Sequence, residues 1–243
     1  MEPVISIRHL SFKYPDGNIA LRDVSLDVAL GERLAVIGPN GAGKSTLFFH
    51  LNGTFRGEGE IAVLGHLLTN ENLYEIRRQV GLVFQDPNDQ LFMPTVFEDV
   101  AFGPMNLGCS ETEIRDRVLK ALAQVGMEGS EALVPHHLSL GQRKKVALAC
   151  VLALDPQILA FDEPSSGLDP SSRRALIRFL KNLPQTQLIA THDLDLVLDL
   201  CQRAIIIDRG QIVDQGTVPE IFEDESRLKA HGLERPLSMQ ARR

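Results

Sequence analysis

The stretch GPNGAGKST at residues 38–46 decides the fold. Gly38 and Gly43 frame it, and Lys44 and Ser45 follow the second glycine, which is the spacing of a phosphate-binding loop. An apolar run precedes the loop and KSTLFFHL follows it, so a buried strand should lead through the loop into a helix. Glycines let backbone N–H groups wrap around phosphates, and the helix N-terminus adds partial positive charge. The stretch therefore predicts a nucleotide-binding α/β protein.

Two side chains of this loop have specific predicted roles. The Lys44 ammonium supplies charge for the β and γ phosphates of ATP, and the Ser45 hydroxyl is a predicted Mg2+ ligand. A glycine-rich turn before an ordinary lysine-bearing helix is the alternative, which the spacing and the strand-loop-helix context disfavour. The residues predicted here to bind ATP are Gly38, Pro39, Asn40, Gly41, Ala42, Gly43, Lys44, Ser45 and Thr46.

Polar side chains also end three other predicted strands. ILAFDE at 158–163 ends in Asp162 and Glu163, and carboxylates at the end of a buried strand are costly unless a cation meets them. We expect Asp162 to hold Mg2+ and Glu163 to act as general base toward the attacking water. Acidic residues that favour a helix N-terminus are the alternative.

The other two strand ends carry His192 and Gln85. In open α/β sheets, ligands gather at the carboxyl ends of the strands, so both side chains should reach the same edge as Glu163. Both are predicted to act in catalysis, with Gln85 also a metal ligand. A hydrogen-bonded histidine at a strand end, with no catalytic role, is the alternative for His192.

Composition narrows the partners. The net charge of the 243 residues is −7, and no long basic stripe with interleaved aromatic residues is present, which disfavours nucleic acid. The three cysteines are far apart and form no disulfide framework or CxxC zinc pattern. The longest apolar run, at 146–154, is shorter than the ~20 residues that a membrane span needs.

The order of predicted elements indicates an α/β fold with a mostly parallel core sheet. Segments 4–14 and 19–28 read as strands of an N-terminal antiparallel β subdomain, and strands alternate with helices after residue 155. Helical patterns dominate between these parts. We therefore predict a core of residues 1–93 and 155–225, an inserted helical subdomain at 94–154, and a short, polar, loosely held tail at 226–243.

Taken in order, the motifs resemble the ATP-binding subunits of ABC (ATP-binding cassette) transporters across nearly the whole chain. The phosphate loop, Gln85, LSLGQ at 138–142, Asp162-Glu163, SGLD at 166–169 and His192 follow that family's sequence of motifs. The resemblance implies that Tyr14 stacks on adenine. It also implies a head-to-tail dimer, in which Ser139, Gly141 and Gln142 bind the ATP of a second ATPase subunit and Asp169 lies at the interface. A homodimer is favoured over a pair with a paralogue, because every motif is present.

One residue of LSLGQ departs from the family, which usually has glycine where Leu140 stands. We predict that Leu140 takes a negative φ and points away from the nucleotide. Arg143, Lys144 and Lys145 stand near the unfavourable, positive end of the next predicted helix. We expect them either to lie near a partner's triphosphate or to form a solvated face.

VFQDPNDQLFMPTVFEDVAFGPMNLG at 83–108 resembles the energy-coupling factor (ECF) group of these transporters. The resemblance implies a peripheral subunit at the cytoplasmic face of the cell membrane that drives an integral membrane coupling protein and a substrate-capture protein. Asp86, Asp89 and the apolar residues 91–93 would then lie near the coupling protein, with core packing of 91–93 as the alternative. The short chain end after GTVPEIF favours cobalt as cargo, with nickel or biotin as alternatives.

Two other functions compete with this interpretation. A soluble ABC ATPase that acts on nucleic acid or ribosomes is disfavoured by the net charge and by the single cassette. A P-loop kinase of small molecules leaves LSLGQ unexplained. The adjacent His136 and His137 do not indicate a cobalt site, because neighbouring histidines do not easily share a metal on one face.

Overall fold

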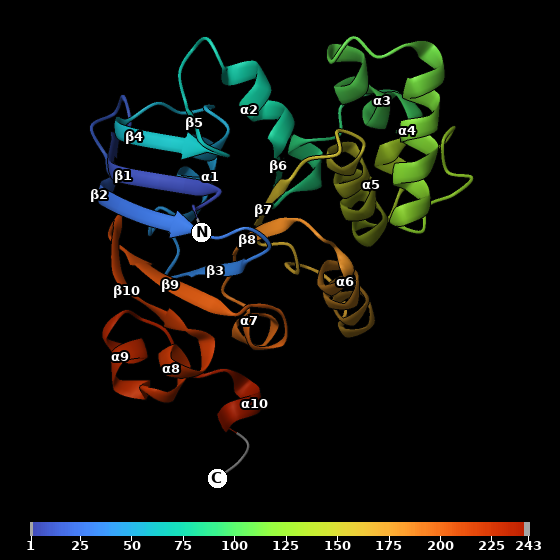
Figure 1. Cartoon of the computed structure of the whole chain (residues 1–243). Helices are drawn as coiled ribbons and strands as arrows, with labels where there is room; N and C mark the ends of the chain where they lie inside the picture. The colour runs from blue at the N-terminus through green and yellow to red at the C-terminus, as the bar shows by residue number, and fades with distance from the viewer. Residues whose placement is uncertain (1, 241–243) are drawn as a thin grey trace.

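The computed structural model describes residues 2–240 and contains two β-sheets (Figure 1). The smaller sheet has the strand order β2-β1-β4-β5, and the larger has the order β10-β9-β3-β8-β7-β6. All neighbours from β9 to β6 are parallel, and β10 is antiparallel to β9. The strands are β1 Ile5–Lys13, β2 Ile19–Val28, β3 Arg33–Ile37, β4 Glu58–Val63, β5 His66–Leu67, β6 Val80–Val83, β7 Ile158–Asp162, β8 Thr186–Ala190, β9 Arg203–Asp208 and β10 Gln211–Thr217.

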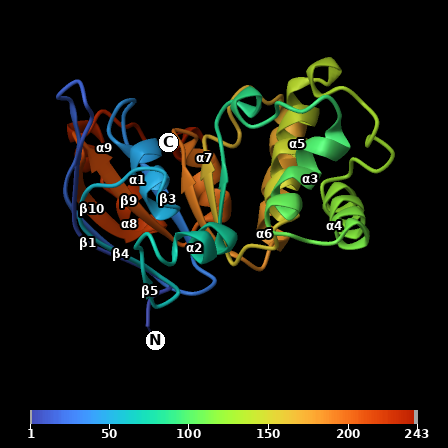
Figure 2. The ribbon, with the colours of Figure 1, turned by 90° about the horizontal axis from the view of Figure 1, so that it is seen from above.

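The helices cover both faces of the larger sheet and form a separate block beside it (Figure 2). Among the described residues, no helix is long and apolar enough to cross a bilayer. The helices are α1 Lys44–Leu51, α2 Leu73–Gln79, α3 Val96–Asn106, α4 Glu111–Gln124, α5 Leu140–Leu152, α6 Pro170–Asn182, α7 Leu194–Leu200, α8 Val218–Glu223, α9 Glu225–Ala230 and α10 Leu237–Gln240. Two short 3-10 turns add η1 Pro87–Asp89 and η2 Pro135–His137.

The strands of the larger sheet are buried on both faces. Along β3, Leu34 and Val36 pack into a core shared with β1, β2 and α1, while Ala35 and Ile37 pack on the opposite side with α7 and α8. Because successive side chains of a strand point to opposite faces, a continuous apolar run is what a doubly covered parallel strand requires. The mostly parallel core and the antiparallel pair β1–β2 confirm the predicted fold class.

Helices α3, α4 and α5 form the helical block, which lies between β6 and β7 in the chain. Val100, Val118 and Val146, one from each helix, are fully buried in a common core. Ser110 and Glu113 form a capping box at the start of α4. The block is therefore an inserted helical subdomain, as expected, and the boundaries at residues 94 and 154 stay a prediction.

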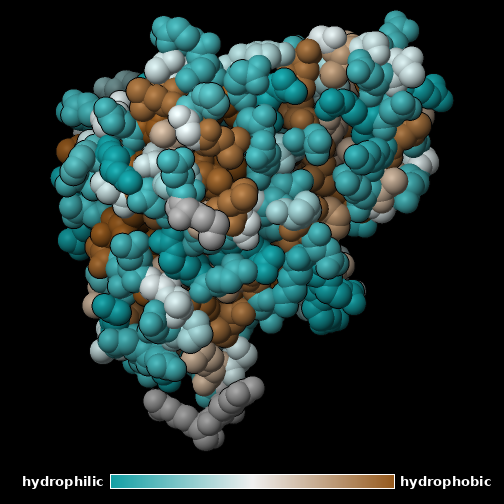
Figure 3. All heavy atoms as spheres, viewed as in Figure 1, coloured by the Kyte–Doolittle hydropathy of each residue, from teal (hydrophilic) through white to brown (hydrophobic). Residues whose placement is uncertain are grey.

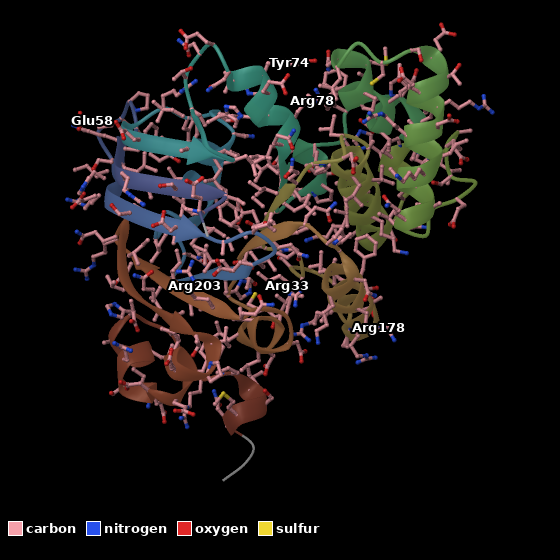
Figure 4. The ribbon with its side chains drawn as sticks, in the orientation of Figure 1. Arg33, Glu58, Tyr74, Arg78, Arg178 and Arg203 are labelled. Atoms are coloured by element: carbon pink, nitrogen blue, oxygen red, sulfur yellow. The ribbon has the colours of Figure 1, made fainter. Side chains whose placement is uncertain are left out.

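Arg203 links the two sheets from the first position of β9. Its Nε lies 2.6 Å from Glu32 Oε1, and its Nη2 donates to the carbonyl of Asp27 at the end of β2. Arg33 stands beside it in the adjacent strand β3, and its Nε donates to Leu200 O at 2.8 Å (Figure 4). These arginines fix the amino ends of the central strands, and so they leave the carboxyl ends free for loops.

The C-terminal segment differs from the loosely held tail that the sequence suggested. Leu228, in α9, is fully buried with Ile221 and Phe222 of α8 against the face of β3 and β9. Asp195 of α7 accepts hydrogen bonds from the backbone of Leu237 and Ser238. The expectation failed because short apolar stretches among many charged residues give a weak helical pattern. Residues 241–243 of the predicted tail lie outside the described residues.

We predict that Leu228→Ala lowers the free energy of unfolding by about 2–4 kcal/mol, because it leaves a cavity in a closed core. Urea denaturation followed by circular dichroism measures the change. Lys229→Ala, at the next position and on the exposed side of α9, is the control and should change stability by less than about 0.5 kcal/mol. Equal stability of wild type and Leu228→Ala would contradict the packing of the tail.

Candidate nucleotide-binding and hydrolysis site

Four adjacent parallel strands end at one edge of the larger sheet. In the order β3-β8-β7-β6, their carboxyl ends lead to Gly38, to His192, to Asp162 and Glu163, and to Gln85. These positions are up to 154 residues apart in the sequence, counted from 38 to 192, yet the topology places them side by side. The predicted gathering of these residues at one edge is thus present in the structure.

A cavity of about 500 Å³ opens at this edge. It collects side chains from the phosphate loop, from the antiparallel sheet and from the ends of β6, β7 and β8. Asn18 and Ala20 were not predicted, since a loop asparagine and a strand alanine carry no motif. The lining residues are Tyr14, Asn18, Ala20, Asn40, Gly41, Ala42, Gly43, Lys44, Ser45, Thr46, Gln85, Asp162, Glu163 and His192.

The phosphate loop is held in shape by its own lysine and by tight backbone packing. Lys44 Nζ donates to the carbonyls of Gly38 and Pro39, at 2.8 and 3.0 Å. Gly43 has φ +109°, and a Cβ added there would lie 2.6 Å from the carbonyl oxygen of Ala20. A side chain is therefore excluded on both conformational and steric grounds. The lysine and the glycine thus hold the loop in a compact conformation.

Charges of both signs are buried around this cradle. Burial lowers the pKa of Lys44, and the nearby carboxylates of Glu163 and Asp162 act in the opposite direction. Burial raises the pKa of Asp162, while a hydrogen bond from Ser45 lowers it. A carboxylate and a hydroxyl so placed match the oxygen ligands that Mg2+ prefers. Ser45 and Asp162, together with the amide oxygen of Gln85 on the cavity wall, therefore fit the predicted metal role.

Glu163 is the most constrained acid of the site. Its Oε2 accepts hydrogen bonds from Thr191 Oγ1 at 3.1 Å and from His192 N at 3.3 Å, and His192 Nδ1 lies 2.8 Å from the same oxygen. The Glu163 side chain is 7% exposed, whereas that of His192 is 66% exposed. The two predicted catalytic residues are therefore in direct contact, with the carboxylate inside and the imidazole at the mouth.

The backbone of Glu163 is strained. Its φ is +46°, in the left-handed region that costs a residue other than glycine about 1–2 kcal/mol. Its N–H donates to Ala190 O of β8 at 2.8 Å, and its carbonyl accepts from Ser166 N at 3.1 Å. Such conformations persist where the surrounding structure holds them in place. No residue pattern around position 163 predicts this strain.

Asp193 connects the histidine to two other segments, and sequence reasoning missed it. Its carboxylate accepts two hydrogen bonds from Arg173 of α6, at 2.5 and 2.7 Å, and one from Ser165 Oγ at 3.0 Å. The Arg173 contact lowers the pKa of Asp193 against the effect of burial. An aspartate directly before an apolar helix is a standard N-cap pattern, and Asp193 does cap α7. That pattern could have identified it.

Tyr14 also lines the cavity. Its hydroxyl and that of Thr46 are 2.9 Å apart, and its ring packs edge-on against Phe12 and Phe55. These contacts fix the ring on the cavity wall, in a place that a planar base can reach. Stacking on adenine remains a prediction.

The residues of LSLGQ do not line this cavity. Leu140 borders a neighbouring groove, together with Gly167. Ser139 is the N-cap of α5: its Oγ accepts from Gln142 N at 3.3 Å, and Gln142 Oε1 accepts from Ser139 N at 2.9 Å. Leu140 begins the helix with ordinary helical backbone, so the predicted negative φ is confirmed. The chain thus keeps Ser139, Gly141 and Gln142 away from its own phosphate loop.

Two of the basic residues after LSLGQ are bonded to carbonyl oxygens of their own chain. Arg143 Nη1 donates to Leu138 O at 2.6 Å, and Lys144 Nζ donates to the carbonyls of Glu163 and Pro164. Their place near a partner's triphosphate stays a prediction. Lys145 is exposed and lies beside Gly126 at the end of α4. Only for Lys145 does the solvated-face alternative describe the structure.

Two other expectations concern interfaces. Asp169 caps α6: its Oδ1 accepts from Ser171 N at 2.8 Å and from Ser172 N at 3.1 Å. A hydrogen bond from the Ser172 hydroxyl, together with these backbone bonds, lowers the pKa of Asp169. Its place at a dimer interface stays a prediction. Of the apolar residues 91–93, Leu91 is only 2% exposed, so core packing describes it, whereas Phe92 is 60% exposed.

Gln90 was also missed and joins the end of β6 to the helical block. Its Oε1 accepts from Phe84 N at 3.3 Å, and its Nε2 donates to Ala147 O of α5 at 2.7 Å. The segment after Gln85 is therefore bonded to the same helix that begins with LSLGQ.

Comparison with known proteins identifies the family. The family profile described as ABC transporter matches residues 21–166. A Gloeobacter violaceus protein provisionally named an ABC transporter ATP-binding protein is 53% identical over 98% of this chain and 99% of its own length. An energy-coupling factor transporter ATP-binding protein, EcfA, of Methanothermobacter thermautotrophicus is 47% identical over 96% of this chain and 77% of its own.

Solved structures agree. CbiO1 of Clostridium perfringens, described as part of the ABC transporter complex CbiONQ, superposes with a TM-score of 0.82 at 36% identity, over 95% of this chain and 94% of that one. A dimeric ATP-binding cassette bound to ADP and phosphate gives a TM-score of 0.78 at 28% identity, over 88% and 98% of the two chains. The chain has a phosphate cradle and a buried acid in contact with a histidine. Together with the matching family profile and these relatives, they show that the chain belongs to the ATP-binding cassettes of the ABC transporter family.

Proposed function

We propose that this ABC ATPase is the energy-supplying subunit of an ECF-type importer and works as a head-to-tail dimer. The observation that carries the proposal is the division of the ATP-binding motifs. The phosphate loop, Glu163 and His192 line one cavity, while Ser139 and Gly141 lie outside it. A site with half of its ligands elsewhere on the chain is complete only when a second subunit supplies them. Relatives named EcfA, and the dimeric structural neighbour, support this arrangement.

The chain's own residues divide the chemistry among them. The phosphate loop and Lys44 bind the β and γ phosphates, and Ser45, Asp162 and Gln85 are the proposed ligands of Mg2+. The metal, when bound with ATP, neutralises charge that develops on the phosphates. Glu163 is the proposed general base that takes a proton from the attacking water. His192 orients the Glu163 carboxylate through their 2.8 Å contact.

In the proposed cycle, ATP shifts the population of subunits toward a closed dimer. The Ser139 hydroxyl, the Gly141 N–H and Gln142 of one subunit would bind the γ phosphate held by the other. Hydrolysis removes this shared ligand and returns the dimer to the open state. A homodimer is favoured, since one chain supplies both halves of the site.

The proposed surface for the membrane coupling protein lies on the helical block. Phe92, Phe102 and Met105 are 60%, 41% and 61% exposed, and the rings of Phe92 and Phe102 pack edge-on at 5.1 Å. Figure 3 shows hydrophobic side chains among hydrophilic ones on this block. Asp99 fixes the loop from below, because its Oδ1 accepts from the backbone N–H groups of Phe92 and Met93. Grouped exposed apolar side chains are typical of protein interfaces.

Asp86 and Asp89 belong to the same proposed surface. Asp86 is the N-cap of η1 and Asp89 is its last residue, and both border the groove beside the phosphate loop. The remaining partner in the proposal is a substrate-capture protein, and the proposed place of the assembly is the cytoplasmic face of the cell membrane. Cobalt is the proposed cargo. Nickel and biotin stay alternatives, because the ATPase itself does not contact the cargo.

The transport function is tested by expressing the chain with and without the membrane proteins encoded beside it. We expect the chain to extract in detergent with those proteins, to hydrolyse ATP faster in their presence, and to support uptake of 57Co2+ into cells. An ATPase rate that ignores them, or that rises with DNA or ribosomes, would contradict the proposal. Uptake of labelled biotin or nickel instead would replace the cargo alone.

We predict that Glu163→Gln lowers the rate of ATP hydrolysis by roughly 10²- to 10⁴-fold, because the amide does not accept the proton of the attacking water. ATP affinity should be unchanged, since the phosphate loop is intact. Phosphate release and titration with a fluorescent ATP analogue measure the two quantities. Glu128→Gln, an exposed acid of the helical block, is the control and should hydrolyse ATP at the wild-type rate.

We predict that Ser139→Arg leaves ATP binding to the monomer intact but prevents ATP-driven dimerisation. In a Glu163→Gln background, size-exclusion chromatography with light scattering should show monomers with ATP. Ser110→Arg is a matched control, because Ser110 caps α4 with the same capping box but lies away from the proposed interface. It should lose a similar ~1 kcal/mol of capping energy and still dimerise. Wild-type ATPase activity in Ser139→Arg would refute the shared site.

A further inference from the structure

Lys144 connects the helix that begins with LSLGQ to the turn that carries the general base. It stands in the second turn of α5, two residues after Gln142. Its Nζ donates to Glu163 O at 3.2 Å and to Pro164 O at 3.1 Å. Burial lowers the pKa of this amine, while the carboxylates of Glu163 and Asp86 act in the opposite direction. One half-buried cation is thus bonded to two consecutive carbonyls of the catalytic turn.

This turn depends on bonds from outside, because the φ of Glu163 is +46°. On one side, β8 holds Glu163 through its N–H and through the contacts of Thr191 and His192 with its carboxylate. On the other side, the Glu163 carbonyl accepts from Lys144, together with the backbone N–H of Ser166. Lys144 is therefore the contact through which the helical block bonds to the backbone of the acid.

A second contact joins the same two segments. A Cβ placed on Gly167, whose φ is +72°, would lie 2.8 Å from Leu140 Cδ2. Leu140 thus packs directly on Gly167, in the segment that follows Glu163. Leu140 itself stands where the family usually has glycine. The first two turns of α5 touch this segment at both of its ends, so movement of α5 displaces the segment.

We propose that Lys144 is a positioning residue that transmits the position of the LSLGQ helix to Glu163 of the same chain. In the dimer of the proposed function, that helix binds the ATP of the partner, while Glu163 acts on the ATP of its own chain. Lys144 therefore makes hydrolysis at one ATP depend on closure around the other. This step beyond the single chain rests on the proposed dimer, whereas the positioning of Glu163 does not.

The positioning role is tested with Lys144→Met, which keeps a chain of similar length and removes the N–H donors. We expect kcat for ATP hydrolysis to fall roughly 10- to 100-fold, because a misplaced base acts poorly, with KM for ATP within about twofold of wild type. Lys144→Arg retains donors and should recover most of kcat. Lys145→Met, which removes the same charge from the exposed face of the same turn, should match wild type.

A kcat within about twofold of wild type in Lys144→Met, or a loss that Lys144→Arg does not recover, would overturn the proposal. Unfolding of a fraction of the enzyme would also lower the apparent kcat at constant KM, so the stoichiometry of binding of a fluorescent ATP analogue separates positioning from unfolding. A thermal melt of each variant accompanies the kinetics.

The coupling between sites has its own readout. Wild type should show a Hill coefficient above 1 for ATP, and Lys144→Met a coefficient close to 1. In the Glu163→Gln background, Lys144→Met should still dimerise with ATP, because the LSLGQ residues are intact. If Glu163→Gln alone does not dimerise with ATP, the proposed dimer is contradicted. The positioning role of Lys144 is then still decided by the kcat of Lys144→Met. An unchanged Hill coefficient above 1 in Lys144→Met would overturn the coupling.

Discussion

The structure depends on a buried lysine that faces two buried carboxylates at the carboxyl edge of the larger sheet. Lys44, Asp162 and Glu163 are 7%, 9% and 5% exposed. The two carboxylates repel each other, and Lys44 attracts both. A buried charge without an opposite partner would cost several kcal/mol, so the carboxylates require Lys44 or a cationic ligand. The parallel order β3-β8-β7-β6 is what brings them together, because it places the ends of β3 and β7 on either side of β8. The fold can therefore be understood as the scaffold of this charge cluster.

The contacts around the cluster fall into two groups that belong to different parts of the chain. Those from the segment between β8 and α7 hold the side chain of Glu163 and, through Asp193, reach α6. Those from α5 hold its backbone. The acid is therefore held between the sheet, which also carries the nucleotide cradle, and the helical block, which carries the motif proposed to face a partner. An ATPase controlled by assembly requires a catalytic group that responds to both parts.

Residue spacing was enough to predict the sheet edge. The phosphate loop, the acidic strand end and the positions of His192 and Gln85 follow from apolar runs that end in polar residues, since parallel strands deliver their carboxyl ends to one place. The strain at Glu163 and the bonds of Lys144 could not be predicted, because each depends on contacts between residues 19 to 29 positions apart in the sequence. The folded tail was missed for a related reason: Leu228 is buried by a surface that only the assembled sheet provides. In LSLGQ, the backbone of Leu140 was predictable from helix geometry, but its packing on Gly167 was not.

The close approach of Gly43 to the carbonyl of Ala20 ties the phosphate loop to the antiparallel sheet. A Cβ on Gly43 would lie 2.6 Å from that carbonyl oxygen, so β2 packs directly on the loop. The core and the helical block are joined by two chain crossings, one after Gln85 and one near Asp155, whose φ is +55°. Gln90 and Lys144 are bonded across this division. Because the bonds of Lys144 end on the turn of Glu163, a rotation of the helical block would act on the backbone of the proposed general base.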